Sequence, residues 1–333
     1  MILVIGATGY VGRYFCTEMV NRGIDVLALG RSAKVAEFFK ENRVPFQYFD
    51  FAEDKSFESL PTEGVDAVID LSARLAELET PINELFEVNT IGVYKTLEFA
   101  YRHGIKKVVV SSSHKLQNDI YKDIICEDDG ISFTGDHSPY IISKIAAEYF
   151  VEWYNKDFGM NGIVLRFTGV HGYGEILGHL KADGTYKKST FELFFEKALK
   201  GEPIEVWGDQ SIKRDHIYIK DVVDALYLAA MSGEVKGVYN IATGVGYSQY
   251  DEAAAWAELL QPETGKSEII LRPDLPGLTR SYVFDISKTK RDLGWEPKYT
   301  DIMDMFKDYF EEWKSKKYHN YHYIREGEGP ASL

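Results

Sequence analysis

The sequence has few cysteines, no long apolar run and fewer basic than acidic residues. Cys16 and Cys126 are its only cysteines and form no C-x-x-C pair, so neither a disulfide framework nor a cysteine-based zinc site is indicated. Apolar runs such as residues 1–5 and 108–110 fall far short of the ~20 residues that span a bilayer. Lys and Arg number 38 against 52 Asp and Glu, and the net charge of −14 argues against binding to nucleic-acid phosphates.

The sequence also shows no basic, apolar and then small-residue leader before its first apolar run, so we expect no export signal. Together with the scarcity of cysteine, this favours the reducing cytoplasm. Hydrophobic residues make up 45% of the 333 residues and aromatic residues 14%, which is enough for a large core and excludes disorder as the main state. The length suits two domains, or one domain with a lobe.

Short apolar segments alternate with longer amphipathic segments in the first half of the chain. The short segments are typical of parallel strands buried on both faces, and the longer ones have the apolar spacing of helices. This β-α-β-α order predicts an α/β fold with a doubly wound, Rossmann-like parallel sheet, whose ligands bind beyond the carboxyl ends of the strands. The predicted strands are Ile2–Ile5, Val26–Leu29, Phe46–Tyr48, Ala67–Leu71, Lys107–Ser111 and Gly162–Phe167, and the predicted helices are Val11–Arg22, Leu85–His103 and Pro139–Phe158.

The alternation breaks after about Thr168, where a glycine-rich stretch begins. The later elements predicted are helix Thr190–Lys200, the turn-rich segment Gly201–Asp209, helix Lys220–Met231 and strand Val238–Ala242. Because the last two resume the earlier pattern, we expect the chain to return to the sheet, so that both domains are discontinuous. The predicted division is a dinucleotide-binding domain of residues 1–168 and about 215–245, a smaller substrate lobe of about 169–214 and 246–317, and a surface or disordered tail of 318–333.

Three glycines, Gly6, Gly9 and Gly12, follow the first predicted strand as G-x-x-G-x-x-G and open the first helix. Helix N-terminal amides can hold a pyrophosphate, so this setting favours a dinucleotide site over an ordinary strand-to-helix turn. After the second strand, Arg31 stands where a carboxylate would bind the adenosine ribose. A guanidinium can pair with a 2′-phosphate, which favours NADP over NAD, and the alternative is an arginine that stacks on adenine. The cofactor candidates in this region are Gly6, Thr8, Gly9, Tyr10, Val11, Gly12, Arg31 and Ser32, with Asp50 and Phe51 for the adenine edge and face.

A second pattern joins Tyr140 to Lys144. Tyr140 is the only one of 22 tyrosines with a lysine four positions later, and both lie on one face of a predicted helix. A neighbouring ammonium favours the phenolate form, which a free phenol with a pKa near ~10 does not supply at neutral pH. The fifth strand ends in Ser111-Ser112-Ser113, where a hydroxyl can bond a reacting substrate oxygen, although serines at strand ends are often only turn formers.

With these motifs, nearly the whole chain resembles the extended short-chain dehydrogenase/reductase family, in its NAD(P)-dependent nucleotide-sugar epimerase/dehydratase branch. Other segments are similar to that family's motifs in the same order. They are Asp70-Leu71-Ser72-Ala73 (H-L-A-A-like), Asn89-Thr90-Ile91-Gly92 (N-x-x-G), Arg214 to Val222 (R-D-F-I-Y-V-x-D-V), Tyr239 to Ala242 (Y-N-I-G), and Asp285 to Lys288 with Leu293-Gly294-Trp295 (the closing signature).

The resemblance implies roles for particular residues. Tyr140 would be the acid/base, Lys144 would lower its pKa and bind the nicotinamide ribose, and Ser113 would complete the triad. Arg214 would bind a substrate diphosphate, the alternative being a surface salt bridge. The resemblance also implies a homodimer packed through the helices around Leu97 and Ala147, or alternatively helices that face their own core. The remaining implied cofactor contacts are Leu71, Ser72, Ala73, Asn89, Ser111, Tyr140, Lys144, Phe167 and Val170.

The chain departs from the family pattern at two places. The family's R-x-x-N-V-Y-G is Arg166-Phe167-Thr168-Gly169-Val170-His171-Gly172 here, which removes an asparagine that commonly contacts the nucleotide sugar. His114 and Lys115 stand where dehydratases of this branch carry an Asp-Glu pair, which argues against a dehydratase. His114 and His171 are candidates for contacts to substrate hydroxyls, with purely structural roles as the alternative. His319 and His322 have the spacing of a metal pair but no evident third ligand, so no metal is predicted.

We therefore predict an NAD(P)-dependent nucleotide-sugar epimerase that transiently oxidises a sugar hydroxyl to a ketone. The runner-up is an NADPH-dependent reductase of a keto-sugar or other small carbonyl compound, favoured by Arg31 and the altered position 169. A non-catalytic, cofactor-sensing scaffold is a third possibility, against which the intact Ser113, Tyr140 and Lys144 set argues. The expected partners are a small-molecule substrate and a second copy of the chain, with no nucleic acid and no membrane.

Overall fold

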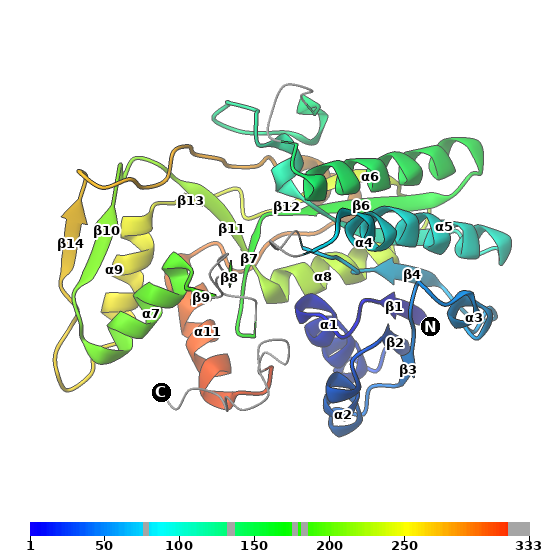
Figure 1. The fold of residues 1–333 in the computed structure, drawn as a ribbon, viewed down its shortest axis with the longest axis horizontal. Helices are drawn as coiled ribbons and strands as arrows, with labels where there is room; N and C mark the ends of the chain where they lie inside the picture. Colours follow the sequence, from blue (N-terminus) through cyan, green and yellow to red (C-terminus); the bar gives the residue numbers. More distant parts are fainter. Residues whose placement is uncertain (76–79, 132–136, 175–178, 181–185, 319–333) are drawn as a thin grey trace.

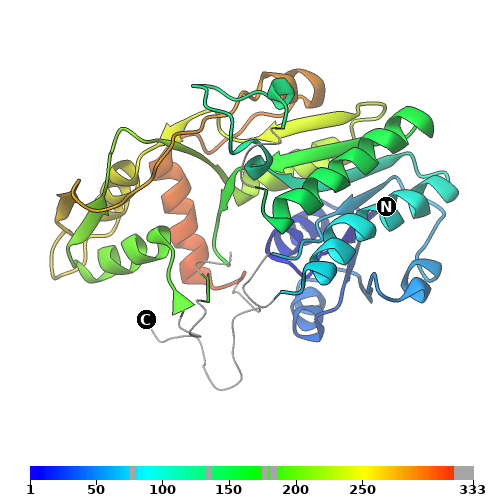
Figure 2. The same ribbon diagram turned by 45° about the horizontal axis from the view of Figure 1, so that its top comes forward.

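The computed structural model describes residues 1–333 except 76–79, 132–136, 175–178, 181–185 and 319–333. Its centre is a seven-stranded, entirely parallel sheet in the order β12-β6-β5-β4-β1-β2-β3 (Figures 1 and 2). This confirms the predicted α/β class and doubly wound sheet. The strands are β1 (Ile2–Ile5), β2 (Val26–Gly30), β3 (Phe46–Tyr48), β4 (Ala67–Asp70), β5 (Lys107–Ser113), β6 (Asn161–Phe167) and β12 (Gly237–Ile241).

Helices cover both faces of this sheet, and the strands alternate their side chains between two apolar layers. In β1, Ile2 and Val4 pack in one layer and Leu3 and Ile5 in the other. Helices α5 and α6 lie on one side of the sheet, and α1 and α8 on the other (Figure 1). These helices, with two shorter ones, are α1 (Tyr10–Asn21), α2 (Ala33–Glu41), α3 (Asp54–Glu58), α5 (Gly92–Arg102), α6 (Pro139–Asp157) and α8 (Ile219–Ala230).

The helix predicted over residues 85–103 is divided into three parts, which corrects the sequence-based expectation. Helix α4 (Ile82–Phe86) passes through a π-helical segment, η1 (Glu87–Ile91), into α5. Asn89 lies in η1, where its Oδ1 accepts from the Arg74 amide at 2.7 Å and its Nδ2 donates to Ser143 Oγ at 3.0 Å. The wider turn thus presents the Asn89 amide to two neighbouring segments, as π-helical insertions near functional sites often do.

The lobe is built from small sheets and helices beyond the carboxyl edge of the central sheet. Strand β11 pairs in parallel with β7 and antiparallel with β13, and β10 pairs in parallel with β14. The segment predicted to be turn-rich contains β10, because Ile204 and Val206 alternate into the core. Its elements are β7 (Gly169–His171), β8 (His179–Leu180), β9 (Tyr186–Lys187), α7 (Thr190–Lys200), β10 (Ile204–Trp207), β11 (Arg214–Tyr218), β13 (Gly246–Tyr247), α9 (Gln249–Leu259), β14 (Ile269–Arg272) and α11 (Ile302–Ser315). Helix α10 (Ser287–Leu293) instead packs against β12 of the central sheet.

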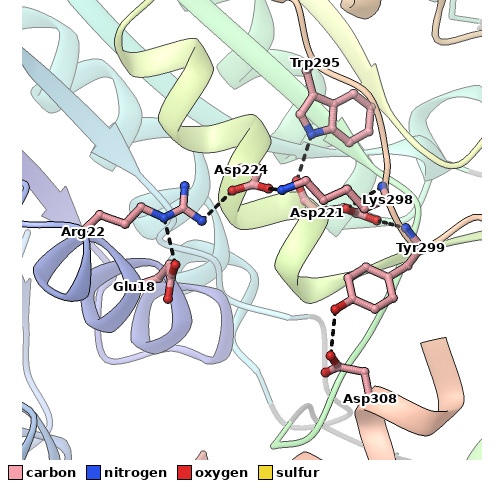
Figure 3. A network of polar contacts seen from close by, with 8 residues as sticks. All are labelled: Glu18, Arg22, Asp221, Asp224, Trp295, Lys298, Tyr299 and Asp308. Atoms are coloured by element: carbon pink, nitrogen blue, oxygen red, sulfur yellow. Dashed lines mark hydrogen bonds and ion pairs between the residues drawn. The ribbon is translucent and has the colours of Figure 1, made fainter. Parts of the chain in front are cut away.

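A polar network fastens the segment before α11 to α8 (Figure 3). The Asp221 carboxylate accepts from the amides of Lys298 at 2.8 Å and Tyr299 at 3.0 Å, and Trp295 Nε1 donates to the Asp221 carbonyl at 3.0 Å. Asp224 pairs with both Lys298 and Arg22, the residue after α1. Residues 295–299 are therefore held against helices of the central sheet.

Tyr318 is the first residue of the predicted tail and the last described residue of the chain. It is 5% exposed and stacks on Tyr14 of α1 with ring centroids 3.6 Å apart, so this residue is buried and not at the surface. The other tail residues, His319 and His322 among them, lie outside the described residues. Within the described ranges, no helix has the length and apolar content that crossing a membrane requires.

Candidate active site

The glycine-rich turn connects β1 to α1 with no room for additional side-chain atoms. Gly6 has a φ of +76°, and a Cβ there would lie 2.6 Å from the Ser72 amide nitrogen. At Gly12 a Cβ would lie 2.5 Å from Ala7 Cα. Gly9 precedes α1, and no side chain caps this helix terminus. The uncapped amides suit a pyrophosphate, and the cofactor role of Gly6, Gly9 and Gly12 stays a prediction.

The residues predicted around the adenosine lie at the ends of β2 and β3. Arg31 is 60% exposed, and its Nη1 lies 3.4 Å from Asp50 Oδ2. Ser32 caps α2, because its hydroxyl accepts from the Val35 amide. Phe51 is buried in the core and meets Phe49 edge to face, so its ring is used in packing. Arg31 is thus an accessible cation after β2, and it forms an ion pair with the Asp50 carboxylate.

The end of β4 brings a buried carboxylate to the site. Asp70 Oδ1 accepts from the Ser72 amide at 2.9 Å, and Oδ2 accepts from Thr96 Oγ1 at 3.0 Å. Burial raises the pKa of Asp70, while these hydrogen bonds and Lys144 lower it. Leu71, Ser72 and Ala73 follow directly. The hydrogen bonds from Ser72 to Asp70 therefore hold the segment that is predicted to line the cofactor.

Ser113 is the last residue of β5, and Tyr140 and Lys144 lie in the first half of α6. Burial raises the pKa of Tyr140, whereas the hydrogen bond between the Tyr140 and Ser113 side chains lowers it. Lys144 is 2% exposed, and its Nζ donates to the carbonyls of Ser111 at 3.0 Å and Ser72 at 3.5 Å. Burial lowers the pKa of Lys144 to about 8, opposed by Asp70 and Glu148. Ser113 and Tyr140 are therefore in contact, and Lys144 is anchored next to the ends of β4 and β5.

A buried ion pair between Glu148 of α6 and Arg166 of β6 lies close to Lys144 and Ser112. Glu148 lies one turn after Lys144 on α6, and its carboxylate accepts from Arg166 Nη2 and from Ser112 Oγ, each at 2.6 Å. Both charged side chains are almost fully buried. Sequence reasoning placed Arg166 in a motif but did not identify Glu148 as its partner, since the two meet only after α6 packs on β6.

Two guanidinium groups face the lobe side of the site. Arg214 lies over the Tyr282 ring at 5.3 Å, and Arg280 lies near the same ring at 5.9 Å. Arg280 Nη2 donates to the Ile120 carbonyl, but its Nε and Nη1, like Arg214 Nε, are buried without a hydrogen-bond partner in the structure. No carboxylate of a described residue lies within ion-pair distance of Arg214. The pair can therefore hold an anion such as a diphosphate. The sequence reasoning missed Arg280, which no motif marked.

His114 and His171 lie on the same side of the site. His114 Nδ1 donates to the Phe167 carbonyl at 3.1 Å, which leaves Nε2 as an acceptor, and the ring packs against Tyr282. Burial lowers the pKa of His114 to about 3 and that of His171 to about 4. Both imidazoles are thus neutral near pH 7. Phe167 and Val170, the remaining predicted cofactor contacts, lie at the end of β6 and within β7.

Comparison with known proteins identifies relatives along the whole chain. The family described as "NAD dependent epimerase/dehydratase family" matches residues 2–242. The UDP-glucose 4-epimerase of Halalkalibacterium halodurans is 26% identical over 336 residues, covering 96% of this chain and 97% of that protein. A dTDP-4-dehydro-6-deoxyglucose reductase of Escherichia coli is 24% identical, with 91% and 94% covered. The crystal structure of UDP-glucose 4-epimerase with UDP-glucose from Thermotoga maritima has a TM-score of 0.72 at 25% identity, with 95% and 99% covered.

Proposed function

The chain belongs to the NAD-dependent epimerase/dehydratase family, and we propose that it is a nucleotide-sugar epimerase working through Ser113, Tyr140 and Lys144. The observation that carries the proposal is the hydrogen bond between Ser113 and Tyr140, with the buried Lys144 held at the ends of β4 and β5. Arg214 and Arg280 lie against Tyr282, whose ring packs on His114, the residue after Ser113. An acid/base group near an anion-binding pair suits a substrate with both a reacting hydroxyl and a diphosphate.

The glycine turn and the ends of β4 and β5 would hold the dinucleotide. When bound, the nicotinamide would supply the hydride acceptor and donor for sugar oxidation and reduction. Tyr140 would take the proton of the sugar hydroxyl and later return it, while Ser113 holds the same oxygen by a hydrogen bond. Burial keeps the Tyr140 phenol protonated in the ligand-free protein, so its ionisation needs nearby positive charge. Lys144 supplies such a charge from the same helix face.

The groups after Ser113 favour epimerisation over elimination of water. His114 and Lys115 begin the 3-10 segment η2 (His114–Gln117), and neither offers a carboxyl group. His114 is neutral and holds the Phe167 carbonyl, so it does not replace a paired acid and base. These observations support the ranking of epimerase above dehydratase.

We propose that the substrate is a nucleoside diphosphate sugar. Arg214 and Arg280 supply three buried nitrogen atoms without hydrogen-bond partners in the structure, and an anion would satisfy them. Two relatives named above are UDP-glucose 4-epimerases, and one of them was crystallised with UDP-glucose. A UDP-hexose is therefore the first substrate to test.

A reductase is the second candidate, because the Escherichia coli relative is a dTDP-sugar reductase and Arg31 is exposed beside the turn. A reductase exchanges its dinucleotide at each turnover, and Arg31 would favour the 2′-phosphate of NADPH. The nearby Asp50 opposes that preference, since its carboxylate would repel the phosphate. Substituting Asp50 by Asn should therefore strengthen NADP binding relative to NAD, as titration by fluorescence would measure.

The deciding experiment incubates the purified protein with UDP-sugars and catalytic NAD in D₂O and follows the products by proton NMR. An epimerase that transfers hydride within one active site gives the epimer without deuterium at the inverted carbon and without net NADH. Stoichiometric oxidation of NADPH by a keto-sugar would instead assign the reductase. Absence of both reactions, with cofactor bound, would refute both candidates.

We also propose a cytoplasmic homodimer formed through α5 and α6. Leu97 and Ala147, around which the interface was expected, are buried in the chain's own core and do not contribute. The large apolar side chains that are exposed on these two helices are Tyr101, Ile142, Tyr149 and Trp153, at 41%, 42%, 65% and 43%. Light scattering at micromolar concentration would show a monomer if the proposal is wrong.

A further inference from the structure

Two imidazoles and a carboxylate from three separate elements converge beside β7. His171 ends β7, His216 lies in β11 and Glu252 lies in α9. One ligand atom from each residue lies within 4.8 Å of the other two, and His216 Nε2 is 3.5 Å from Glu252 Oε1. None of the three belongs to the proposed triad, and only His171 was a candidate from the sequence.

The strand register explains how these rings come together. His216 pairs with Gly169 across the parallel strands β7 and β11, and a Cβ at Gly169 would lie 2.5 Å from His216 Nδ1. Glycine at this position therefore makes room for the His216 ring. His171, two residues later, lies with its ring centroid 4.4 Å from His216 and stacks on Phe191 at 4.5 Å. Both rings are thus held in place by their neighbours.

The three groups are also in a suitable chemical state. A neutral imidazole carries one unprotonated ring nitrogen, which is the form of histidine that binds metal ions. Nδ1 of His216 faces Gly169, which turns Nε2 toward Glu252. Glu252 is 8% exposed and contributes the negative charge.

We propose that His171, His216 and Glu252 form a binding site for a divalent transition-metal ion of the zinc type. Two imidazoles and one carboxylate are a ligand set that zinc uses in proteins, and nitrogen ligands disfavour Mg²⁺ and Ca²⁺. With metal–ligand bonds of 2.0–2.1 Å, tetrahedral ligands lie about 3.4 Å apart, close to the 3.5 Å between His216 and Glu252. Rotation of side chains would close the longer separations.

Three protein ligands leave a coordination position for water or a substrate oxygen. Arg214 lies two residues before His216 in β11, on the same face of the strand, so the metal site borders the anion-binding pair. Metal binding is measured without turnover, so it tests this site whether or not the chain is an epimerase. The site could not be predicted from the sequence, because residues 171, 216 and 252 lie far apart along the chain.

The test uses full-length protein without an affinity tag, dialysed against Zn²⁺, Co²⁺ or Mg²⁺ and analysed for bound metal. We expect one Zn²⁺ per chain, visible Co²⁺ absorption bands of a low-coordinate site, and no stoichiometric Mg²⁺. Glu252→Gln and His171→Phe preserve shape and stacking but remove a ligand. Since outer-shell changes alone weaken metal binding by ~10–100-fold, each should weaken Zn²⁺ binding by about 100-fold or more.

Two controls separate this site from other metal ligands. Glu258→Gln on the exposed face of α9, and a double substitution of His319 and His322 by Ala, should leave Zn²⁺ binding unchanged. Gly169→Ala keeps all three ligands but displaces the His216 ring, and should weaken binding while the circular dichroism spectrum stays the same. Absence of stoichiometric Zn²⁺ from the unmodified protein would overturn the proposal. The proposal would also be overturned if the His319/His322 variant lost Zn²⁺ binding while the Glu252→Gln and His171→Phe variants kept it.

Discussion

The buried Arg166–Glu148 pair allows a quantitative prediction about stability. Glu148 accepts from Arg166 and from Ser112, and Arg166 also donates through Nη1 to the Glu127 carbonyl at 3.3 Å. Replacing Glu148 by Leu would leave a buried guanidinium without its counter-ion. Because both side chains are less than a tenth exposed, water cannot replace the lost carboxylate without opening the packing of α6 on β6.

Breaking a buried ion pair costs about 3–5 kcal/mol of unfolding free energy. With about 2.1 cal/mol/K of unfolding entropy per residue, a 333-residue chain that unfolds as one unit has about 0.7 kcal/mol/K. Glu148→Leu should therefore lower Tm by about 4–7 °C. The double variant Glu148→Leu with Arg166→Leu removes both charges and should recover most of this loss, leaving about 1–3 kcal/mol for the unpaired Ser112 hydroxyl and Glu127 carbonyl.

Scanning calorimetry and urea titration of both variants would measure these values. The matched control is Glu311→Ala, which breaks the exposed Lys314–Glu311 pair and should change stability by no more than about 0.5 kcal/mol. A single variant as stable as the double variant would refute the reasoning, because it would show that the Arg166 charge needs no buried partner.

Three further predictions concern the site. Tyr140→Phe should lower kcat by about 10²–10⁴-fold with dinucleotide binding unchanged, as steady-state rates and titration would show, and full activity would exclude Tyr140 as the acid/base. Arg280→Met should raise KM for a nucleotide sugar, or the Kd of UDP by calorimetry, about 10-fold or more, whereas unchanged binding would remove Arg280 from the anion site. Asp70→Asn should lower the pKa of Lys144 below about 8, because the Asp70 carboxylate raises that pKa. If the reaction requires charged Lys144, activity in this variant should fall at a lower pH than in the unmodified protein. An unshifted pH profile of kcat would contradict this.

The central sheet was predictable because its signals are local. Short apolar runs mark the strands, and the glycine turn and the Tyr140–Lys144 spacing each lie within one element. Local signals cannot show where an element is interrupted, so the π-helical segment around Asn89 was missed: it exists because Asn89 bonds Arg74 and Ser143. The same limit applies to Phe51, whose position in the chain suggested adenine contact but whose ring packs against Phe49.

The residues that distinguish this site were beyond sequence reasoning because their meaning depends on register. In the sequence, Gly169 only replaces the asparagine of the family pattern. His216 is one residue in a segment that otherwise matches the family motif. Once β7 pairs with β11, the two positions lie opposite each other, and the imidazole needs the space that a glycine leaves. Gly169 and His216 are therefore one structural feature. Restoring Asn at position 169 without changing His216 would place a Cβ against the imidazole, so the family residue can return to this position only if the His216 ring moves.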